Sequence, residues 1–122
     1  MANIVLEKSL DFAVRCVKLY GFLCNEKHEY VLSKQMLRSG TSIGANVSES
    51  QGAQTTPDFI SKLHISLKEA RETAYWLLVL YKSNIIDKTE YDSMNNDLSE
   101  LIALLTSILK KTKTNSQEIL NS

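Results

Sequence analysis

Helix-breaking residues are scarce in this sequence, which has one proline and four glycines among 122 residues. This scarcity favours long helices over a fold rich in turns. Long apolar runs are also missing, because none approaches the roughly 18 residues that a membrane-spanning helix needs. The first residues lack the charged and then apolar pattern of a secretory signal peptide. We therefore expect a cytoplasmic protein with no membrane contact, folded as a single domain over residues 1–122.

An excess of charge of either sign is absent, since 14 lysines and arginines balance 14 aspartates and glutamates. A dedicated nucleic-acid-binding protein usually carries a clear basic excess, so the balance argues against that class. Neutrality also makes self-association less costly, because the subunits carry no large net repulsion. Hydrophobic residues make up 43% of the chain, which is enough to build a core.

Residues suited to metal binding or nucleophilic catalysis are few. Cys16 and Cys24 fall in one predicted helix, about 12 Å apart at a rise of about 1.5 Å per residue, too far for a disulfide. We interpret them as small buried hydrophobic residues. Neither His28 nor His64 has a cysteine or carboxylate at metal-ligand spacing on the same helical face, and no nucleophile with a base and an orienting partner is recognisable. The sequence therefore predicts no catalytic residue, metal, cofactor or small-molecule substrate.

The spacing of apolar residues predicts four helices, at residues 4–25, 33–53, 57–83 and 87–112. The expected N-terminal caps are Asn3, Ser33, Thr56 and Asp87. Residues after 112 lose the apolar pattern and are expected to fray. Four helices of similar length with short links predict an all-α fold, an antiparallel up-down-up-down four-helix bundle.

The second helix is predicted against local propensity, because Gly40, Gly44 and several hydroxyl residues lie in its middle. Its periodicity is nevertheless helical, with one face formed by Leu32, Met36, Gly40, Ile43 and Val47. Small residues on a helix allow a second helix to come close. We predict that Gly40 and Gly44 mark such a close contact, whose packing offsets their low helix propensity.

Polar residues follow one another along the second helix at spacings of four, four and three: Arg38, Ser42, Asn46 and Glu49. If the second and third helices form a hairpin that turns near residue 55, residues whose numbers sum to about 110 face each other. This rule places Arg38 opposite Glu72, Ser42 opposite Lys68, and Asn46 opposite His64. The favoured interpretation is a polar seam that sets the register of the two helices. The alternatives are a groove for a ligand or partner, and an enzyme site near Arg38 and Glu72.

Three further features bear on partners. Lys110, Lys111 and Lys113 form the only basic cluster, which either complements a helix C-terminus through the helix dipole or contacts nucleic acid. Tyr75 and Trp76 are adjacent and so point in different directions, which leaves one of them available as an interface anchor unless both are buried.

The first helix carries two adjoining apolar stripes, Val5, Phe12, Cys16, Leu19 and Leu23, and then Leu6, Leu10, Ala13, Val17 and Tyr20. A bundle helix needs about one stripe toward its core. The second stripe is a surplus that predicts self-association.

Several strings in the sequence carry a family resemblance. They are residues 32–46 (LSKQMLRSGTSIGAN) followed by Glu49, residues 58–63 (DFISKL), residues 68–73 (KEARET) and the triplet Tyr75-Trp76-Leu77. Among them are Arg38, Ser39, Gly40, Ser42, Gly44, Asn46, Glu69 and Glu72. The chain resembles the bacterial four-helix-bundle proteins first noticed as open reading frames within intervening sequences of large-subunit ribosomal RNA genes.

The resemblance implies an up-down four-helix bundle, a homopentameric ring and no enzymatic activity. That family is similar to the accessory proteins of diversity-generating retroelements, which are basic pentamers that bind nucleic acid and a reverse transcriptase. This chain departs from them in being neutral. We therefore expect a non-enzymatic, homo-oligomeric scaffold. The alternative is a ring that binds RNA or DNA, with nucleic acid or a nucleic-acid-handling protein as partner.

Overall fold

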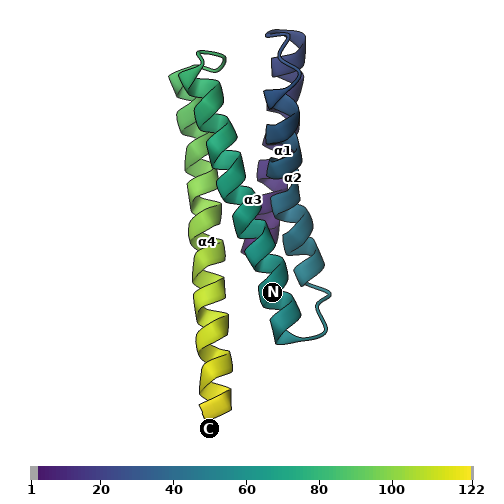
Figure 1. The fold of residues 1–122 in the computed structure, drawn as a ribbon, viewed down its shortest axis with the longest axis vertical. Coiled ribbons are helices and arrows are strands. Elements are labelled where there is room, and N and C mark those ends of the chain that lie inside the picture. Colours follow the sequence, from purple (N-terminus) through teal and green to yellow (C-terminus); the bar gives the residue numbers. More distant parts are fainter. Residues whose placement is uncertain (1–2, 122) are drawn as a thin grey trace.

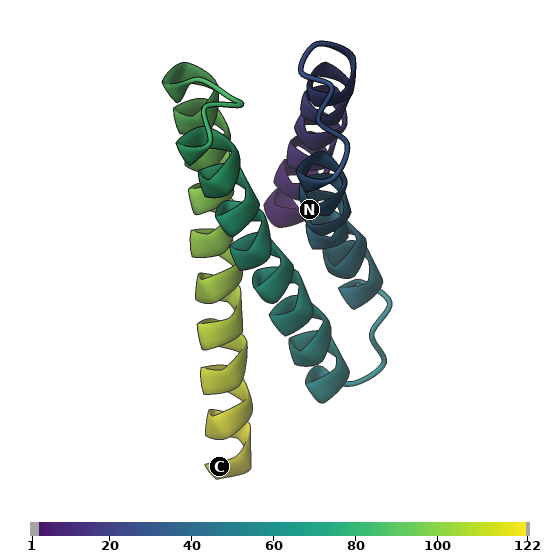
Figure 2. The same ribbon diagram turned by 45° about the horizontal axis from the view of Figure 1, so that its top comes forward.

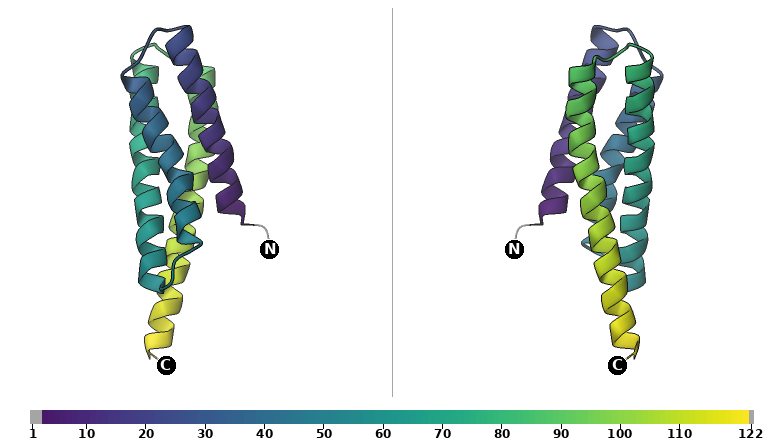
Figure 3. Two further views of the ribbon diagram at one scale, coloured as in Figure 1. Left: turned by 90° about the vertical axis from the view of Figure 1, so that its right-hand side faces the viewer. Right: turned by 90° about the vertical axis from the view of Figure 1, so that its left-hand side faces the viewer.

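A computed structural model describes residues 3–121 as four helices joined by short links (Figure 1). The helices are α1 (Ile4–Asn25), α2 (Leu32–Ser50), α3 (Thr56–Lys82) and α4 (Lys88–Asn121). Successive helices run in opposite directions, so that the α1–α2 and α3–α4 links lie at one end of the bundle (Figure 3). The chain thus adopts the predicted all-α, up-down-up-down arrangement.

The helices follow the chain around the bundle. α2 packs between α1 and α3, and α3 packs in turn on α4 (Figure 2). The contact between α1 and α4 closes the bundle and is the least extensive of the four. Within residues 3–121, the backbones of α1 and α3 do not come close to each other, so these helices occupy diagonal corners.

Two predicted N-terminal caps are confirmed and one is displaced by a residue. Asn3 Oδ1 accepts the backbone N–H of Leu6 at 3.2 Å, and Asp87 Oδ1 accepts that of Glu90 at 2.8 Å. At α3 the cap is Thr55 instead of Thr56, because Thr55 Oγ1 accepts the N–H of Asp58 at 3.2 Å. The proline therefore occupies the second helical position, where its missing N–H still costs nothing.

The predicted Ser33 cap of α2 is wrong. The carboxylate of Glu29 caps α2 instead. Its Oε2 accepts hydrogen bonds from the N–H groups of Val31 at 3.2 Å and Leu32 at 3.1 Å, and its Oε1 accepts one from the N–H of Ser33 at 2.7 Å. Ser33 is buried and donates its hydroxyl to the carbonyl oxygen of Glu29 at 2.8 Å. Partial burial alone would raise the pKa of Glu29, but the hydrogen bonds from these three N–H groups and from Ser33 outweigh it and lower the pKa.

Two helix ends also differ from prediction. α2 ends at Ser50 rather than 53, and α4 runs to Asn121 instead of fraying after 112. Residues 113–121 contain no glycine or proline to stop the helix. Gln117 Nε2 donates to Asn121 Oδ1 at 3.3 Å, one turn along. Ile119 and Leu120 also line an apolar hollow of about 620 Å³ together with Pro57 and Ile60 at the start of α3. The apolar pattern is therefore lost after residue 112 because the core ends there, while the helix itself continues.

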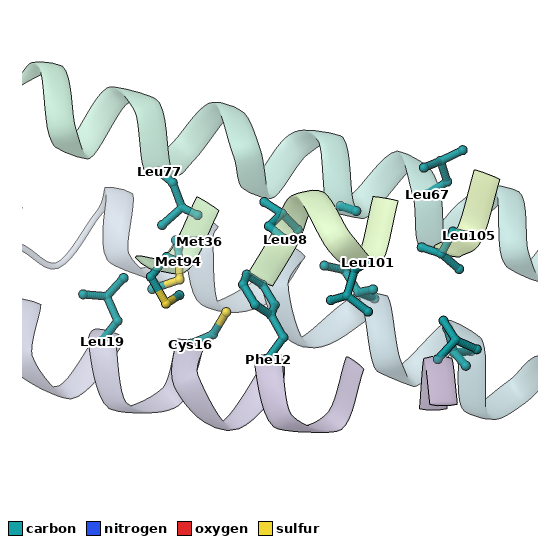
Figure 4. Close-up of a cluster of buried hydrophobic side chains, with 14 of the residues drawn as sticks. Phe12, Cys16, Leu19, Met36, Leu67, Leu77, Met94, Leu98, Leu101 and Leu105 are labelled. Atoms are coloured by element: carbon teal, nitrogen blue, oxygen red, sulfur yellow. The ribbon is translucent and has the colours of Figure 1, made fainter. Parts of the chain in front are cut away.

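The core is formed by the predicted apolar stripes (Figure 4). Its buried members include Phe12, Cys16 and Leu19 of α1, Leu63, Leu67, Ala70 and Leu77 of α3, and Met94, Leu98, Leu101 and Leu105 of α4. Burial of each large apolar side chain contributes about 1.5–3 kcal/mol. These contacts hold the four helices firmly enough to present fixed surfaces.

Candidate functional site

The small residues of α2 lie where α1 comes closest, as predicted. A Cβ atom on Gly44 would sit 3.2 Å from Ser9 Oγ and 3.3 Å from the Ser9 carbonyl oxygen. A Cβ atom on Gly40 would overlap Cys16 Sγ and lie 3.3 Å from Cys16 Cβ. The stretch of α2 that looks like a loop by composition is therefore a helix selected for close packing.

Buried hydroxyl groups join α2 to α3. Thr73 Oγ1 donates to Ser39 Oγ at 2.8 Å, and Ser66 Oγ donates to the Ile43 carbonyl oxygen at 2.8 Å. Ser66 and Thr73 were not singled out from the sequence. Their spacing of seven residues places both on one inward helical face, and this was the available signal. Because a buried hydroxyl needs a partner, these bonds help to set the register of the two helices.

The predicted polar seam is present at its first position. Arg38 Nη2 contacts Glu72 Oε2, as the antiparallel rule requires, and Arg38 Nη1 lies 3.3 Å from Glu69 Oε2. A second ion pair joins Glu49 to Lys62 at 3.3 Å. Arg38 thus has both of its charged neighbours on α3, which supports the interpretation of the seam as structural.

The other two predicted pairs are not formed. Ser42 Oγ donates to the Arg38 carbonyl oxygen at 2.6 Å, and Asn46 Nδ2 donates to the Ser42 carbonyl oxygen at 2.8 Å. Both side chains therefore bond to the preceding turn of their own helix. Of these three side chains, Arg38 is the one that bonds to α3.

The predicted surplus stripe of α1 is only partly on the surface, because Leu6 and Tyr20 pack against the core while Leu10 and Val17 are exposed. Leu10, Val14 and Val17 are exposed to 61%, 46% and 55%, and we call these three residues the α1 outer face. Their spacing of four and three residues aligns them along one side of the helix. Gly21 continues the same side, so this strip carries no charge over three turns. Part of the predicted surplus is therefore left exposed in one copy of the chain, together with Val14, which the predicted stripe did not include.

The structure separates the roles of the two adjacent aromatic residues. Tyr75 is 59% exposed, while Trp76 packs against the core. Their rings lie edge to face with centroids 5.2 Å apart. Trp76 Nε1 is buried and has no hydrogen-bond partner within residues 3–121. Tyr75 is thus the member of the pair that is available to a partner.

The three clustered lysines are all exposed on α4. Their predicted explanation by the helix dipole fails, because α4 continues to Asn121 and Lys113 lies about two turns before that end. The dipole acts on charges within the last turn of a helix. Lys110, Lys111 and Lys113 are therefore a mid-helix basic patch that needs another explanation.

The reactive residue types show no catalytic grouping in the part of the chain that the structure describes. Burial raises the pKa of the Cys16 thiol to about 12, so it stays protonated at neutral pH. Among residues 3–121, no group of three or more histidine, cysteine, aspartate or glutamate side chains is arranged to hold a metal ion. None of the helices in this range is long and apolar enough to cross a membrane.

Comparison with known proteins identifies relatives of this chain. Residues 1–107 match the family described as 23S rRNA-intervening sequence protein. A crystal structure from Bacteroides thetaiotaomicron, of a protein with unknown function from the S23 ribosomal protein family, is 57% identical with a TM-score of 0.86. The match covers 87% of this chain and 98% of that one. No protein with a curated description matches.

Proposed function

Because the chain belongs to the 23S rRNA-intervening sequence protein family, we propose that it is a non-enzymatic interaction module that assembles into a ring of identical copies in the cytoplasm. The observation that carries this proposal is the α1 outer face. Contiguous apolar surface of this kind is uncommon on monomers and is typical of an interface. The balanced net charge places no barrier against contact between copies.

The position of the exposed apolar residues favours a ring over a two-fold dimer. The α1 outer face is at one corner of the bundle, and a second exposed set, Tyr75 and Leu78, lies on α3 at the diagonal corner. A two-fold dimer uses the same patch on both copies, whereas a ring joins one patch to a different one. Two apolar patches on diagonal helices fit the second geometry. The number five rests on the family resemblance alone.

The mass of the particle tests this proposal directly. Light scattering coupled to size exclusion should give five times the 13.8 kDa of one chain. Leu10→Glu should break the assembly, because its carboxylate would be buried without a partner at the interface. Val31→Glu is the matched control, since Val31 is 71% exposed but lies outside the α1 outer face.

Three outcomes would count against this reading. A wild-type particle of one chain would refute self-association. A dimer would refute the ring but leave the interface argument standing. Equal effects of Leu10→Glu and Val31→Glu would show that the α1 outer face is not the contact.

A second candidate function is nucleic-acid binding by the ring, favoured by the mid-helix patch of Lys110, Lys111 and Lys113. A ring would repeat this patch and add avidity to a weak contact. Since the chain has no net positive charge, the expected binding is weak, indifferent to sequence and lost as salt rises.

Titration of single-stranded and duplex RNA at low and physiological salt measures this binding. Glutamine at all three lysines should remove it, while Lys34→Gln, an exposed site on α2, should not. Tight binding that persists at physiological salt would make nucleic-acid recognition the primary function. Equal binding by the triple variant and wild type would exclude the patch.

A further inference from the structure

A cavity of about 750 Å³ lies between the C-terminal half of α1 and the α3–α4 link. Lys8 pairs with Glu100 and Arg15 pairs with Asp97 at 2.7 Å, and these bridges join the two helices along the first half of α1. Beyond Arg15, no ion pair or hydrogen bond joins α1 to α4 within residues 3–121. The two helices are therefore free to stand apart at this end.

The lining of the cavity combines an apolar, partly aromatic surface with charged and polar side chains. Leu19 and Ile86 are each exposed to only 4%, and Ile85 packs against the core beside them. Tyr81 stacks on Tyr91 with ring centroids 4.7 Å apart, which holds its ring in place. Phe22, at 44% exposure, completes an apolar wall on α1. These surfaces suit a flat apolar molecule.

Some of the positive charges around the cavity are held in ion pairs and others are not. Of its four cations, Arg15 is bound to Asp97, and Lys88 lies 2.6 Å from Asp92. Lys18 and Lys27, both on the α1 side, form no ion pair within the described residues. Lys27 Nζ lies 5.8 Å from the centroid of the Phe22 ring, so its charge stands beside the aromatic wall.

The carboxylates of the lining are on the opposite side. Asp87 caps α4 through the N–H of Glu90, so its charge is offset by the helix N-terminus. Glu90 adds one further negative charge there. The α1 wall is thus cationic and the α4 wall is not. A long polyanion such as RNA would meet these carboxylates, whereas a small anion can place its charge on the α1 side alone.

We propose that this cavity binds a small organic anion, with its flat apolar body against Phe22, Ile85 and Tyr81 and its anionic group beside Lys18 and Lys27. The volume falls within the range of about 300–1,000 Å³ that is usual for small-molecule sites. This inference does not depend on the proposed assembly, because the cavity is formed within one copy of the chain.

A matched pair of fluorescent dyes tests the proposal. 8-Anilinonaphthalene-1-sulfonate carries the required anion on an aromatic body, and N-phenyl-1-naphthylamine has a similar body without charge. Both should bind the full chain. Lys18→Glu combined with Lys27→Glu should raise the Kd of the sulfonate dye at least about fivefold and change that of the neutral dye less than about twofold, as expected for loss of charge attraction. Phe22→Ala, at an exposed position, should weaken both dyes.

Two controls separate the cavity from other surfaces. Leu10→Glu disrupts the α1 outer face, and Lys34→Glu makes the same charge change on α2; neither should alter binding of either dye. The proposal is overturned if the double lysine variant binds the sulfonate dye as wild type does. It is also overturned if Leu10→Glu removes the binding, because the dye would then be reporting the outer face.

Discussion

Gly40 provides the sharpest test of the close packing between α1 and α2. In Gly40→Ala two effects oppose each other. Alanine in place of glycine inside a helix gains about 0.8–1.0 kcal/mol from propensity. The added Cβ, however, would overlap Cys16 Sγ, which is fully buried and cannot swing into solvent. Overpacking of this kind costs about 1–3 kcal/mol. The net expectation is a destabilisation of up to about 2 kcal/mol.

Cys16→Ala supplies the decisive background, because it removes the overlapping sulfur atom. The nearest remaining atoms to the new Cβ are then the Cβ of residue 16 at 3.3 Å, which needs a shift of a few tenths of an ångström, and Thr73 Cγ2 at 3.7 Å, which is an ordinary contact. Gly40→Ala should therefore become neutral or stabilising in this background. The double-mutant cycle should show a coupling of at least about 1 kcal/mol.

Gly21 is the matched control, since a Cβ on it would meet nothing within 4 Å. Gly21→Ala should stabilise the chain by about 0.4–1 kcal/mol through propensity alone. Urea unfolding followed by circular dichroism measures all the variants, at two protein concentrations so that any contribution of association is separated. Close packing of Gly40 against Cys16 is refuted if Gly40→Ala stabilises as much as Gly21→Ala, or if its effect is the same in both Cys16 backgrounds.

Two further predictions concern polar contacts. Alanine at Arg38 and at Glu72 should show a coupling of about 0.5 kcal/mol in a double-mutant cycle, modest because Arg38 is half exposed; additive losses would mean that the pair contributes nothing. Glu29→Gln should cost about 1 kcal/mol at neutral pH, as for other lost caps. Because folding lowers the pKa of Glu29, its stabilisation is complete above the ordinary carboxyl value of 4.5 and is lost as pH falls below it. The difference in urea midpoint between wild type and variant should therefore shrink in acid, and a constant difference would contradict this origin.

Local pattern in the sequence was sufficient for the architecture. Apolar spacing predicted four helices, and short links left one way to arrange them. The same one-dimensional reasoning paired Arg38 with Glu72, because an antiparallel hairpin turns sequence position into spatial position. The count of apolar residues also predicted an excess on α1, and Leu10 and Val17 of that excess are exposed, whereas Leu6 and Tyr20 pack against the core and Val14 was not predicted.

Other features were decided only by the tertiary structure, because they depend on how separate helices and links pack against one another in space. Glu29 caps α2 from outside the helix, since the α1–α2 link turns its carboxylate back onto free N–H groups. α4 continues to Asn121 beyond the last buried core residue of the helix, Leu109, so the apolar period did not mark the end of the helix. Exposure of Tyr75 rather than Trp76 depends on which face of α3 packs against the core. The cavity beside Phe22 arises from the separation of α1 from α4, and such a gap between two helices leaves no trace in the spacing of residues along either one.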